Sequence, residues 1–464
     1  MTMRIHSIFS AYNRLACVFT VTLMISSCAV FKPHKMTELS PDKMLYRDLD
    51  SRDSANLADI PWRSLFTDPN LQMLIDEAIK NNPDMLIAEA RMKRAEAILK
   101  QSRAAFFPSL GVLLQETFSD GTSTPQSAEF VGTTSWEVDI WGKLRNMKRA
   151  SLAAYKESEA YKRAVQTQLV ANIAGTYYLL LARDAQLAIT LKTLDNRVSE
   201  VEVMKVFKQT DVITGADLAL SEANRYSAEV AIPDLRQSIY DTENSLSILL
   251  GRNPGPIRRD SLANQEISAD LKYGVPAQLL ANRPDVKEAE FRFRYNFALT
   301  NVARTYFYPS LTLTGAGGLA EANLPALLTS PQILWNLTAG LFQPVFSQGL
   351  NKQRLRVAEA NEEESLIAFK QTLLNAGAEV AGAMHEYQTA SDKIEIRKKQ
   401  VESLERSVDY TMELLKYTSY TNYTDVLTSE VNLLSAQLGS VNDKLQQLQA
   451  VVFLYQSLGG GWKE

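Results

Sequence analysis

The stretch Arg103-Ala-Ala-Phe-Phe-Pro-Ser-Leu110 lies between a helical pattern and a pattern in which apolar and polar residues alternate. It occurs a second time as Arg304-Thr-Tyr-Phe-Tyr-Pro-Ser-Leu311. Proline lacks an amide hydrogen and disfavours the α conformation in the residue before it. Pro108 and Pro309 therefore each predict a switch from helix to strand.

Each copy is followed by two runs of alternating residues. In the first run Leu110 and Val112 fall on one side, whereas Ser109 falls on the other. The apolar sides of the later runs are formed by Phe130, Trp136, Val138, Ile140, Leu311, Leu313, Ile333, Trp335, Leu337 and Leu341. Strands with lipid on one face and water on the other alternate in this way. We predict two membrane-type strand hairpins, over residues 109–141 and 310–343.

Long helical segments follow both hairpins. From Lys143 to about Lys208 the chain has no proline and almost no glycine. A single helix of that length extends roughly 100 Å, which predicts a projecting rod rather than a compact core. A second helix returns each time, so helical hairpins are predicted over 143–250 and 346–458, with a kink at Pro233.

The two halves of the chain repeat one plan. The tips and return helices align at one constant offset, which matches Lys208, Asp217, Ser221, Glu222, Leu246 and Gly251 with Lys416, Asp425, Ser429, Glu430, Leu454 and Gly459. Repeated matches at one offset indicate an internal duplication. We predict a first repeat over residues 69–258 and a second over 259–464, each with a helix, a strand hairpin and a helical hairpin.

The last return helix carries heptads. Leu427, Leu434, Val441 and Leu448 recur every seven residues, as do Val431, Leu438, Leu445 and Val452. Two such rows form a coiled-coil seam, which requires a neighbouring helix. The alternative is an ordinary amphipathic helix packed in a core.

The N-terminus has the features of an export signal. The apolar core at 15–25 follows positive charge and is too short for a permanent membrane helix. It ends in Ser-Ser-Cys28, which matches the lipobox of bacterial lipoproteins, whose cysteine becomes the first mature residue and carries the lipid. We predict a signal peptide over 1–27, lipidation at Cys28 and an anchored segment over 28–68. The alternative is a plain signal peptide with an incidental cysteine. Ala29, by the sorting rule of these lipoproteins, implies the outer membrane.

Composition excludes several classes of function. The 464 residues are 45% apolar and 22% charged, with a formal net charge of −4, which gives no basic footprint for nucleic acid. The chain has three scattered histidines and neither a nucleophile elbow nor a phosphate-binding glycine loop. We therefore expect no enzyme activity, no cofactor and no protein-built metal site.

Four membrane strands cannot close a barrel, and an open sheet edge in lipid leaves backbone groups unpaired at a cost of several kcal/mol each. The chain must therefore oligomerise. Three copies supply twelve strands and leave room for a wet lumen, whereas the eight strands of a dimer would pack shut. The predicted fold is mainly helical with membrane strands, in which four strands per chain contribute to a shared twelve-strand β-barrel and the long helices form a second tube that continues below it.

Further motifs carry a family resemblance, namely Trp136-Glu-Val-Asp-Ile-Trp-Gly-Lys-Leu-Arg145, Asn282-Arg-Pro-Asp285 and Asn422-Tyr-Thr-Asp-Val-Leu427. Together with the lipobox and the element order, the chain resembles the TolC-like outer membrane factors of tripartite efflux pumps, in particular the lipoprotein branch. The resemblance covers almost the whole mature chain. It implies a homotrimer in outer membrane lipid, with one shared β-barrel that is continued by a long periplasmic α-helical barrel. The partners that it implies are a periplasmic adaptor and an inner-membrane resistance-nodulation-division transporter.

The resemblance also implies a gate of aromatic and acidic residues at the helical-hairpin tips. Candidates are Tyr417, Tyr420, Tyr423 and Asp425 at one tip, and Asp211 and Asp217 at the other. Thr428 stands where members with a well-defined carboxylate ring have an acidic residue. A ring of three Asp425 side chains is one substitute; the alternative is that Asp425 and Asp217 are helix N-caps.

The function that follows is a passive export duct for drugs or other small toxic compounds. The same duct serving metal cations or secreted polypeptides is an alternative. A lipid-anchored periplasmic coiled-coil spacer without a pore is a second alternative, although a spacer has no reason to keep four runs with one apolar face.

Overall fold

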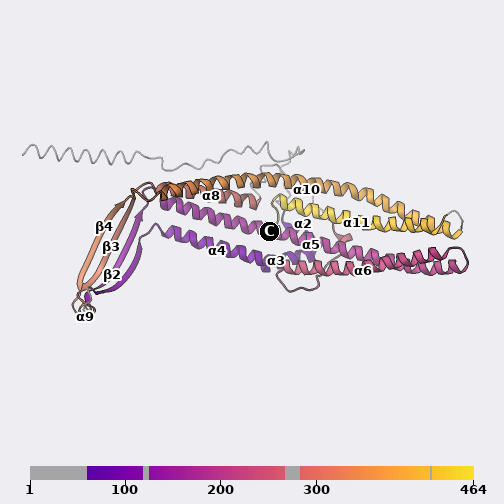
Figure 1. Cartoon of the computed structure of the whole chain (residues 1–464), viewed down its shortest axis with the longest axis horizontal. Coiled ribbons are helices and arrows are strands. Elements are labelled where there is room, and N and C mark those ends of the chain that lie inside the picture. The colour runs from indigo at the N-terminus through magenta and orange to yellow at the C-terminus, as the bar shows by residue number, and fades with distance from the viewer. Residues whose placement is uncertain (1–59, 119–124, 267–282, 418–420, 464) are drawn as a thin grey trace, which may run out of the picture. The chain divides into compact units, whose positions relative to one another are not determined.

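The computed structural model describes residues 60–118, 125–266, 283–417 and 421–463 (Figure 1). Cys28 and Tyr420 lie outside these residues, as does the predicted signal peptide. The described chain divides into two compact units. We call residues 92–158 and 288–370 the sheet unit, and the remaining described residues the helical unit.

The elements follow one another in the predicted order. They are α2 (Trp62–Leu65), α3 (Pro69–Asn81), α4 (Pro83–Ala104), β1 (Ser109–Phe118), β2 (Pro125–Val138), α5 (Lys143–Gln209), α6 (Gly215–Leu249), η3 (Leu262–Asn264), α8 (Pro284–Thr305), β3 (Ser310–Glu321), α9 (Leu324–Thr329), β4 (Gln332–Phe342), α10 (Leu350–Tyr417) and α11 (Tyr423–Ser457).

The duplication is confirmed by element lengths. α4 and α8 both have 22 residues, α5 and α10 have 67 and 68, and α6 and α11 both have 35. The helix-to-strand switches lie where the prolines predict them. α4 ends at Ala104, one turn closes with the Phe107 amide bonded to the Ala104 carbonyl, and β1 begins directly after Pro108.

The four strands form one antiparallel sheet in the order β1-β2-β3-β4. The two predicted hairpins are present, and β2 pairs with β3 to join them. Directly paired residues share a face of a sheet. One row across the four strands is Val112, Gly132, Gly317 and Trp335, and the next is Leu114, Phe130, Leu319 and Ile333.

The opposite face is more polar. One of its rows is Ser109, Ser135, Thr314 and Thr338, although another, Leu113, Val131, Gly318 and Leu334, is apolar. The register therefore places most apolar residues of the four strands on one face and most polar residues on the other, which confirms the predicted alternation.

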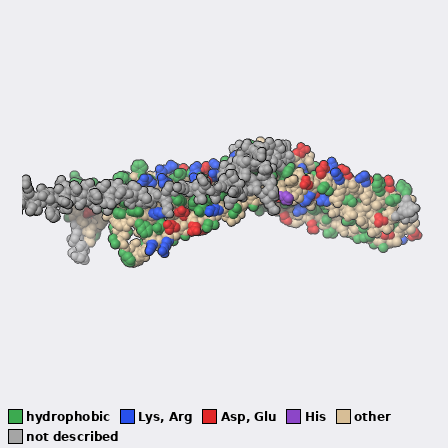
Figure 2. Space-filling view, turned by 90° about the horizontal axis from the view of Figure 1, so that it is seen from above, with side chains coloured by type: hydrophobic (Ala, Val, Ile, Leu, Met, Phe, Trp, Pro, Cys, Tyr) green, Lys and Arg blue, Asp and Glu red, His purple; other side chains and the backbone are tan. Residues whose placement is uncertain are grey.

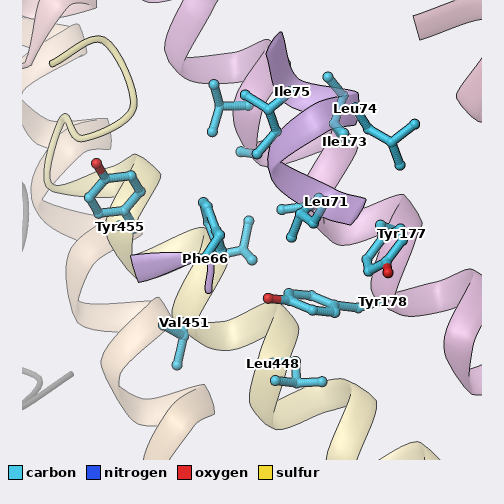
Figure 3. Packing of buried hydrophobic residues seen from close by; sticks show 14 of the residues in the cluster. Phe66, Leu71, Leu74, Ile75, Ile173, Tyr177, Tyr178, Leu448, Val451 and Tyr455 are labelled. Atoms are coloured by element: carbon cyan, nitrogen blue, oxygen red, sulfur yellow. The ribbon is translucent and has the colours of Figure 1, made fainter. Parts of the chain in front are cut away.

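The helical unit has its own core, shown in Figure 3. Leu71 and Ile75 of α3, and Ile173 and Tyr177 of α5 are all fully buried there. Trp62 of α2 belongs to the same core and is fully buried as well. The C-terminal end of α11 packs on the same core: the Tyr455 hydroxyl donates a 2.7 Å hydrogen bond to the Ile60 carbonyl, and its ring meets Phe66 edge-on, with centroids 6.0 Å apart.

Some boundaries differ from the sequence prediction. α10 begins at Leu350, later than the predicted start of its hairpin at 346. The return helices α6 and α11 begin at Gly215 and Tyr423. The reason is that Thr214 and Asn422 are the capping residues. α9, between β3 and β4, was not predicted at all; its start is capped by Asn323. Pro233 lies inside α6, which continues past it.

Candidate functional site

The apolar face of the sheet is open. Leu110 is 85% exposed, Ile333 83% and Trp335 77%. Isolated exposed apolar side chains are normal in soluble proteins, but a contiguous face across four strands marks an interaction surface. This face has the side-chain pattern of strands that contact lipid.

Trp136 and Trp141 are fixed by hydrogen bonds near one end of the sheet. The Trp141 indole donates a 2.7 Å hydrogen bond to the Pro309 carbonyl, and its ring stacks on Tyr308 at 4.9 Å. The Trp136 indole donates to the Phe106 carbonyl at 3.0 Å. Both indoles therefore bond to backbone in the short links that precede β1 and β3.

The tips of both helical hairpins meet in one apolar cluster within the helical unit, the tip cluster. Its buried members are Met204 of α5, Ile213 of the first tip, Leu415 of α10, and Tyr423 and Val426 of α11. Tyr423, predicted as an aperture residue, is only 1% exposed. Its ring therefore packs inside the tip.

Asp217 and Asp425 take the same position in two matching capping boxes. The Asp217 carboxylate accepts from the Thr214 amide at 2.9 Å, and the Thr214 hydroxyl accepts from the Asp217 amide. The Asp425 carboxylate accepts from the Asn422 amide at 3.1 Å. The aspartates are thus the third residues of their helices and Thr214 and Asn422 are the N-caps. The Asn422 amide, with the hydroxyl of neighbouring Thr421, lowers the pKa of Asp425.

Asp211 and Tyr417 are both exposed gate candidates. Asp211 has a φ of 55°, a left-handed conformation that aspartate tolerates in tight turns, and its carboxylate lies 3.5 Å from the Lys208 ammonium. Tyr417 ends α10 with its side chain 82% exposed. Tyr420 lies outside the described residues.

A buried charged cluster lies next to Tyr423. Arg197 and Glu200 of α5 are 4% and 5% exposed, and Glu430 of α11 is half-buried. The Arg197 guanidinium lies 3.0 Å from the Glu430 carboxylate and 3.8 Å from that of Glu200. Burial raises the pKa of both carboxyls, that of Glu430 to about 7, with the charge of Glu200 adding to the effect.

The profile of the outer membrane efflux protein family matches residues 74–252 and 275–460. The chain belongs to this family.

Several members of this family align with the chain over most of its length and of their own. The probable outer membrane lipoprotein SilC of Salmonella typhimurium is 28% identical over 415 residues, covering 88% of this chain and 89% of SilC. The cation efflux system protein CusC of Escherichia coli O6:H1 is 27% identical over 461 residues, covering 96% and 98%. The toluene efflux pump outer membrane protein TtgC of Pseudomonas putida is 26% identical over 436 residues, covering 91% and 90%.

Solved structures show the same fold. The outer-membrane channel OprN superposes with a TM-score of 0.85 at 22% identity, covering 94% of this chain and 100% of OprN. A crystal structure of CusC gives 0.82 at 26% identity, covering 92% and 99%. The chain thus has the internally duplicated, mainly helical TolC-like fold. As a member of the outer membrane efflux protein family, it is an efflux channel component of the outer membrane.

Sequence reasoning missed the cluster of Arg197, Glu200 and Glu430, because a charged residue on a long helix normally faces solvent. One signal was present: Glu430 directly precedes Val431 of the heptad seam. A charge that flanks a seam is placed to contact the neighbouring helix.

The described residues offer no obvious metal site. Across 60–118, 125–266, 283–417 and 421–463, no three His, Cys, Asp or Glu side chains gather in a way that could hold a metal ion. Within the same ranges, no helix combines the length and the apolar character needed to span a membrane. On the face shown in Figure 2, acidic and basic side chains are interspersed over the helices.

Proposed function

We propose that three copies of this chain form a passive export duct, with no catalysis of its own, that is energised by an inner-membrane pump. The observation that carries the proposal is the sheet. Its apolar face continues across all four strands, and β1 and β4 remain as edges that no strand of the described chain covers. In lipid such edges must be paired.

Closure by three copies satisfies these edges. Pairing β4 of one copy with β1 of the next removes every free edge when the ring closes, since heterologous contacts around a three-fold axis form a closed ring. The exposed part of the heptad seam supports the same assembly. Val431 is exposed and Leu434 and Leu438 are half-buried, which leaves apolar surface for a neighbouring helix.

The lipid anchor is proposed at Cys28. It is supported by the lipobox in the sequence and by the name of SilC, an outer membrane lipoprotein of similar length. Cys28→Ala should prevent the incorporation of labelled palmitate, because the residue that carries the lipid is lost. Labelled palmitate on the Cys28→Ala chain would contradict the assignment.

The hairpin tips are proposed to form the periplasmic aperture and to receive the adaptor of the pump. Asp211 and Tyr417 are exposed there, and Asp425 combines a capping role with a solvent-exposed carboxylate. Thr428 occupies the position at which members with a carboxylate ring have an acidic residue. We propose that a ring of three Asp425 carboxylates attracts cations instead. Ion conductance of the Asp425→Ala channel tests this role. If the closed state conducts as in the parent, Asp425 has the capping role alone.

Small toxic compounds are the proposed cargo. TtgC is named for toluene and CusC for cations, so relatives at nearly equal identity carry different cargoes. Metal cations and secreted polypeptides therefore remain alternative cargoes for the same duct. Tolerance assays in a strain without its own outer membrane channel, challenged separately with organic toxins and with metal salts, discriminate between them.

Planar-bilayer recording of the purified protein tests the duct itself. We expect discrete conductance steps from a detergent-stable trimer. A monomeric particle without conductance, with a circular dichroism spectrum that lacks a β component, would support the coiled-coil spacer instead.

A further inference from the structure

We propose that Glu200 and Glu430 form a proton-operated latch that ties α5 to α11 beside the hairpin tips, so that the pH of the periplasm biases the aperture. This inference rests on the proposed duct function. It concerns groups inside the chain, apart from the exposed gate candidates discussed above.

The geometry brings two acids to one base. Arg197 and Glu200 are one turn apart on α5, and Glu430 reaches them from α11. The Arg197 Nη1 atom lies 3.0 Å from Glu430 Oε2 and 3.8 Å from Glu200 Oε2. A single guanidinium therefore stands between two carboxyls, and the cluster carries an excess negative charge when both are ionised.

The cluster also contains more buried polar atoms than it has well-formed hydrogen bonds. Both carboxylate oxygens of Glu200, the Tyr423 hydroxyl and the Ser221 hydroxyl are buried without a protein partner of good hydrogen-bond geometry. The Tyr423 hydroxyl faces Glu200 and Ser221. Unsatisfied buried polar groups cost free energy and call for an explanation such as a bound proton or water.

A single proton resolves the conflict. Protonating one carboxyl removes the excess charge and creates an O–H donor that the other carboxylate accepts, because two like charges at short range disfavour double ionisation. Burial and the neighbouring Glu200 charge raise the pKa of Glu430 to about 7. The pair therefore changes its proton content near neutral pH.

Other charged groups surround the pair but are solvated. The groove beside Arg197 and Glu430 is also lined by Lys192 of α5 and by four charged residues of α10, namely Lys398, Glu402, Glu405 and Asp409. All five are exposed, so water screens their effect. α6 contributes Arg225, whose guanidinium lies 4.0 Å from the carboxylate of Glu229 on the same helix.

The direction of the switch follows from linkage. When α5 and α11 are packed, the pair of carboxyls keeps a bound proton up to about pH 7. When the helices separate, the hydrated carboxyls lose that proton at a lower pH. Packing is therefore favoured as pH falls below about 7 and weakened as pH rises through it. Tyr423 belongs to the tip cluster, and its hydroxyl faces Glu200. Loosening the latch therefore also loosens the tip.

The test is conductance of the full-length protein in planar bilayers between about pH 5.5 and about pH 7.5. For the unmodified chain we expect the ratio of open to closed channels to rise on the order of tenfold across this range. Glu430→Gln keeps the shape of the protonated acid, so it should stay mostly closed with little pH dependence. Glu405→Gln, an exposed glutamate of the same groove, is the matched control and should behave as the parent.

Infrared difference spectra supply a readout that does not need a conducting channel. The parent should show a protonated carboxyl band near pH 6.5 that Glu430→Gln lacks and Glu405→Gln retains. Conductance that ignores pH, or an unchanged pH response in Glu430→Gln, would overturn the latch while leaving the duct intact. Absence of conductance at every pH would instead contradict the duct, and the infrared band would then decide the latch alone.

Discussion

Gly318 of β3 lies so close to Phe130 of β2 that a Cβ atom at position 318 would stand 2.1 Å from the Phe130 carbonyl oxygen. No side chain fits between the two strands at this point. The neighbouring Gly317 has no heavy atom within 4 Å of its Cβ position. The close approach is therefore local to one pair of residues.

Gly318→Ala should weaken the β2–β3 pairing, because the added methyl group clashes with backbone, which cannot rotate away. We expect a loss of about 1–3 kcal/mol in the free energy of unfolding. Gly317→Ala is the matched control and should fall within about 0.5 kcal/mol of the parent. Denaturant titration of the folded protein in detergent measures both, and equal losses in the two variants would contradict the close approach.

Tyr177→Phe should destabilise the helical unit. The Tyr177 hydroxyl donates a 2.5 Å hydrogen bond to Asp68, a buried carboxyl that caps α3 and also accepts from Gln265 at 3.0 Å. Losing a hydrogen bond to a charged, buried group costs about 1.5–3 kcal/mol.

The control for that experiment is Tyr240→Phe, since Tyr240 is largely exposed on α6. Thermal unfolding followed by circular dichroism gives the comparison. Indistinguishable midpoints for the two variants would show that the Tyr177 hydroxyl does not support the core.

Arg283→Ala should be more damaging than loss of a surface arginine. The buried Arg283 guanidinium bonds to Asp285, to Glu379 at 2.7 Å and to the Ser457 carbonyl at 2.7 Å, which fixes the end of α11 to the start of α8. These carboxylates raise the pKa of Arg283 despite its burial. Removing the guanidinium leaves the buried Ser457 carbonyl without its donor, which costs about 1–3 kcal/mol, whereas the Asp285 and Glu379 side chains, 40% and 42% exposed, return to water.

Arg292→Ala is the control for Arg283→Ala. Arg292 pairs with Glu157 at 2.9 Å, but its side chain is exposed, and exposed pairs contribute about 0–1 kcal/mol. Yield of folded protein and the denaturant midpoint should separate the two variants. A larger loss for Arg292→Ala would contradict the role given to Arg283.

Stability should depend on pH in a direction set by Glu430. Its pKa is raised by burial to about 7, so the folded chain binds more protons than the unfolded chain between about pH 4.5 and about pH 7. Stability is therefore greatest at the low end of that window and falls as pH rises through it. The melting temperature of the parent should drop across this window, and that of Glu430→Gln should drop less; an equal drop in both would assign the effect to other groups.

Local chemistry made much of the fold predictable. Pro108 and Pro309 mark the strand starts without any tertiary information, because the restriction they impose is on their own backbone. The apolar face of the sheet followed from period-two alternation, which burial on one side of a strand enforces. The first long helix followed from the absence of proline and the near absence of glycine over about 65 residues after Lys143.

Non-local relationships were not predictable in the same way. The β2–β3 pairing joins residues from different repeats, and nothing near Val131 indicates that Gly318 is its partner. The burial of Glu200 depends on how α5 meets α11, and a glutamate on a helix looks solvated until that contact is known. Tyr423 was expected at the aperture from its position in the tip; its packing against Met204 depends on the same contact.

The mass of the intact particle tests the central claim most directly. Native mass spectrometry of the full-length protein, released from detergent, should give a single species of three chains, because four strands per chain leave two edges that only a closed ring can pair. A stable, folded monomer or an open-ended series of oligomers would contradict the shared duct.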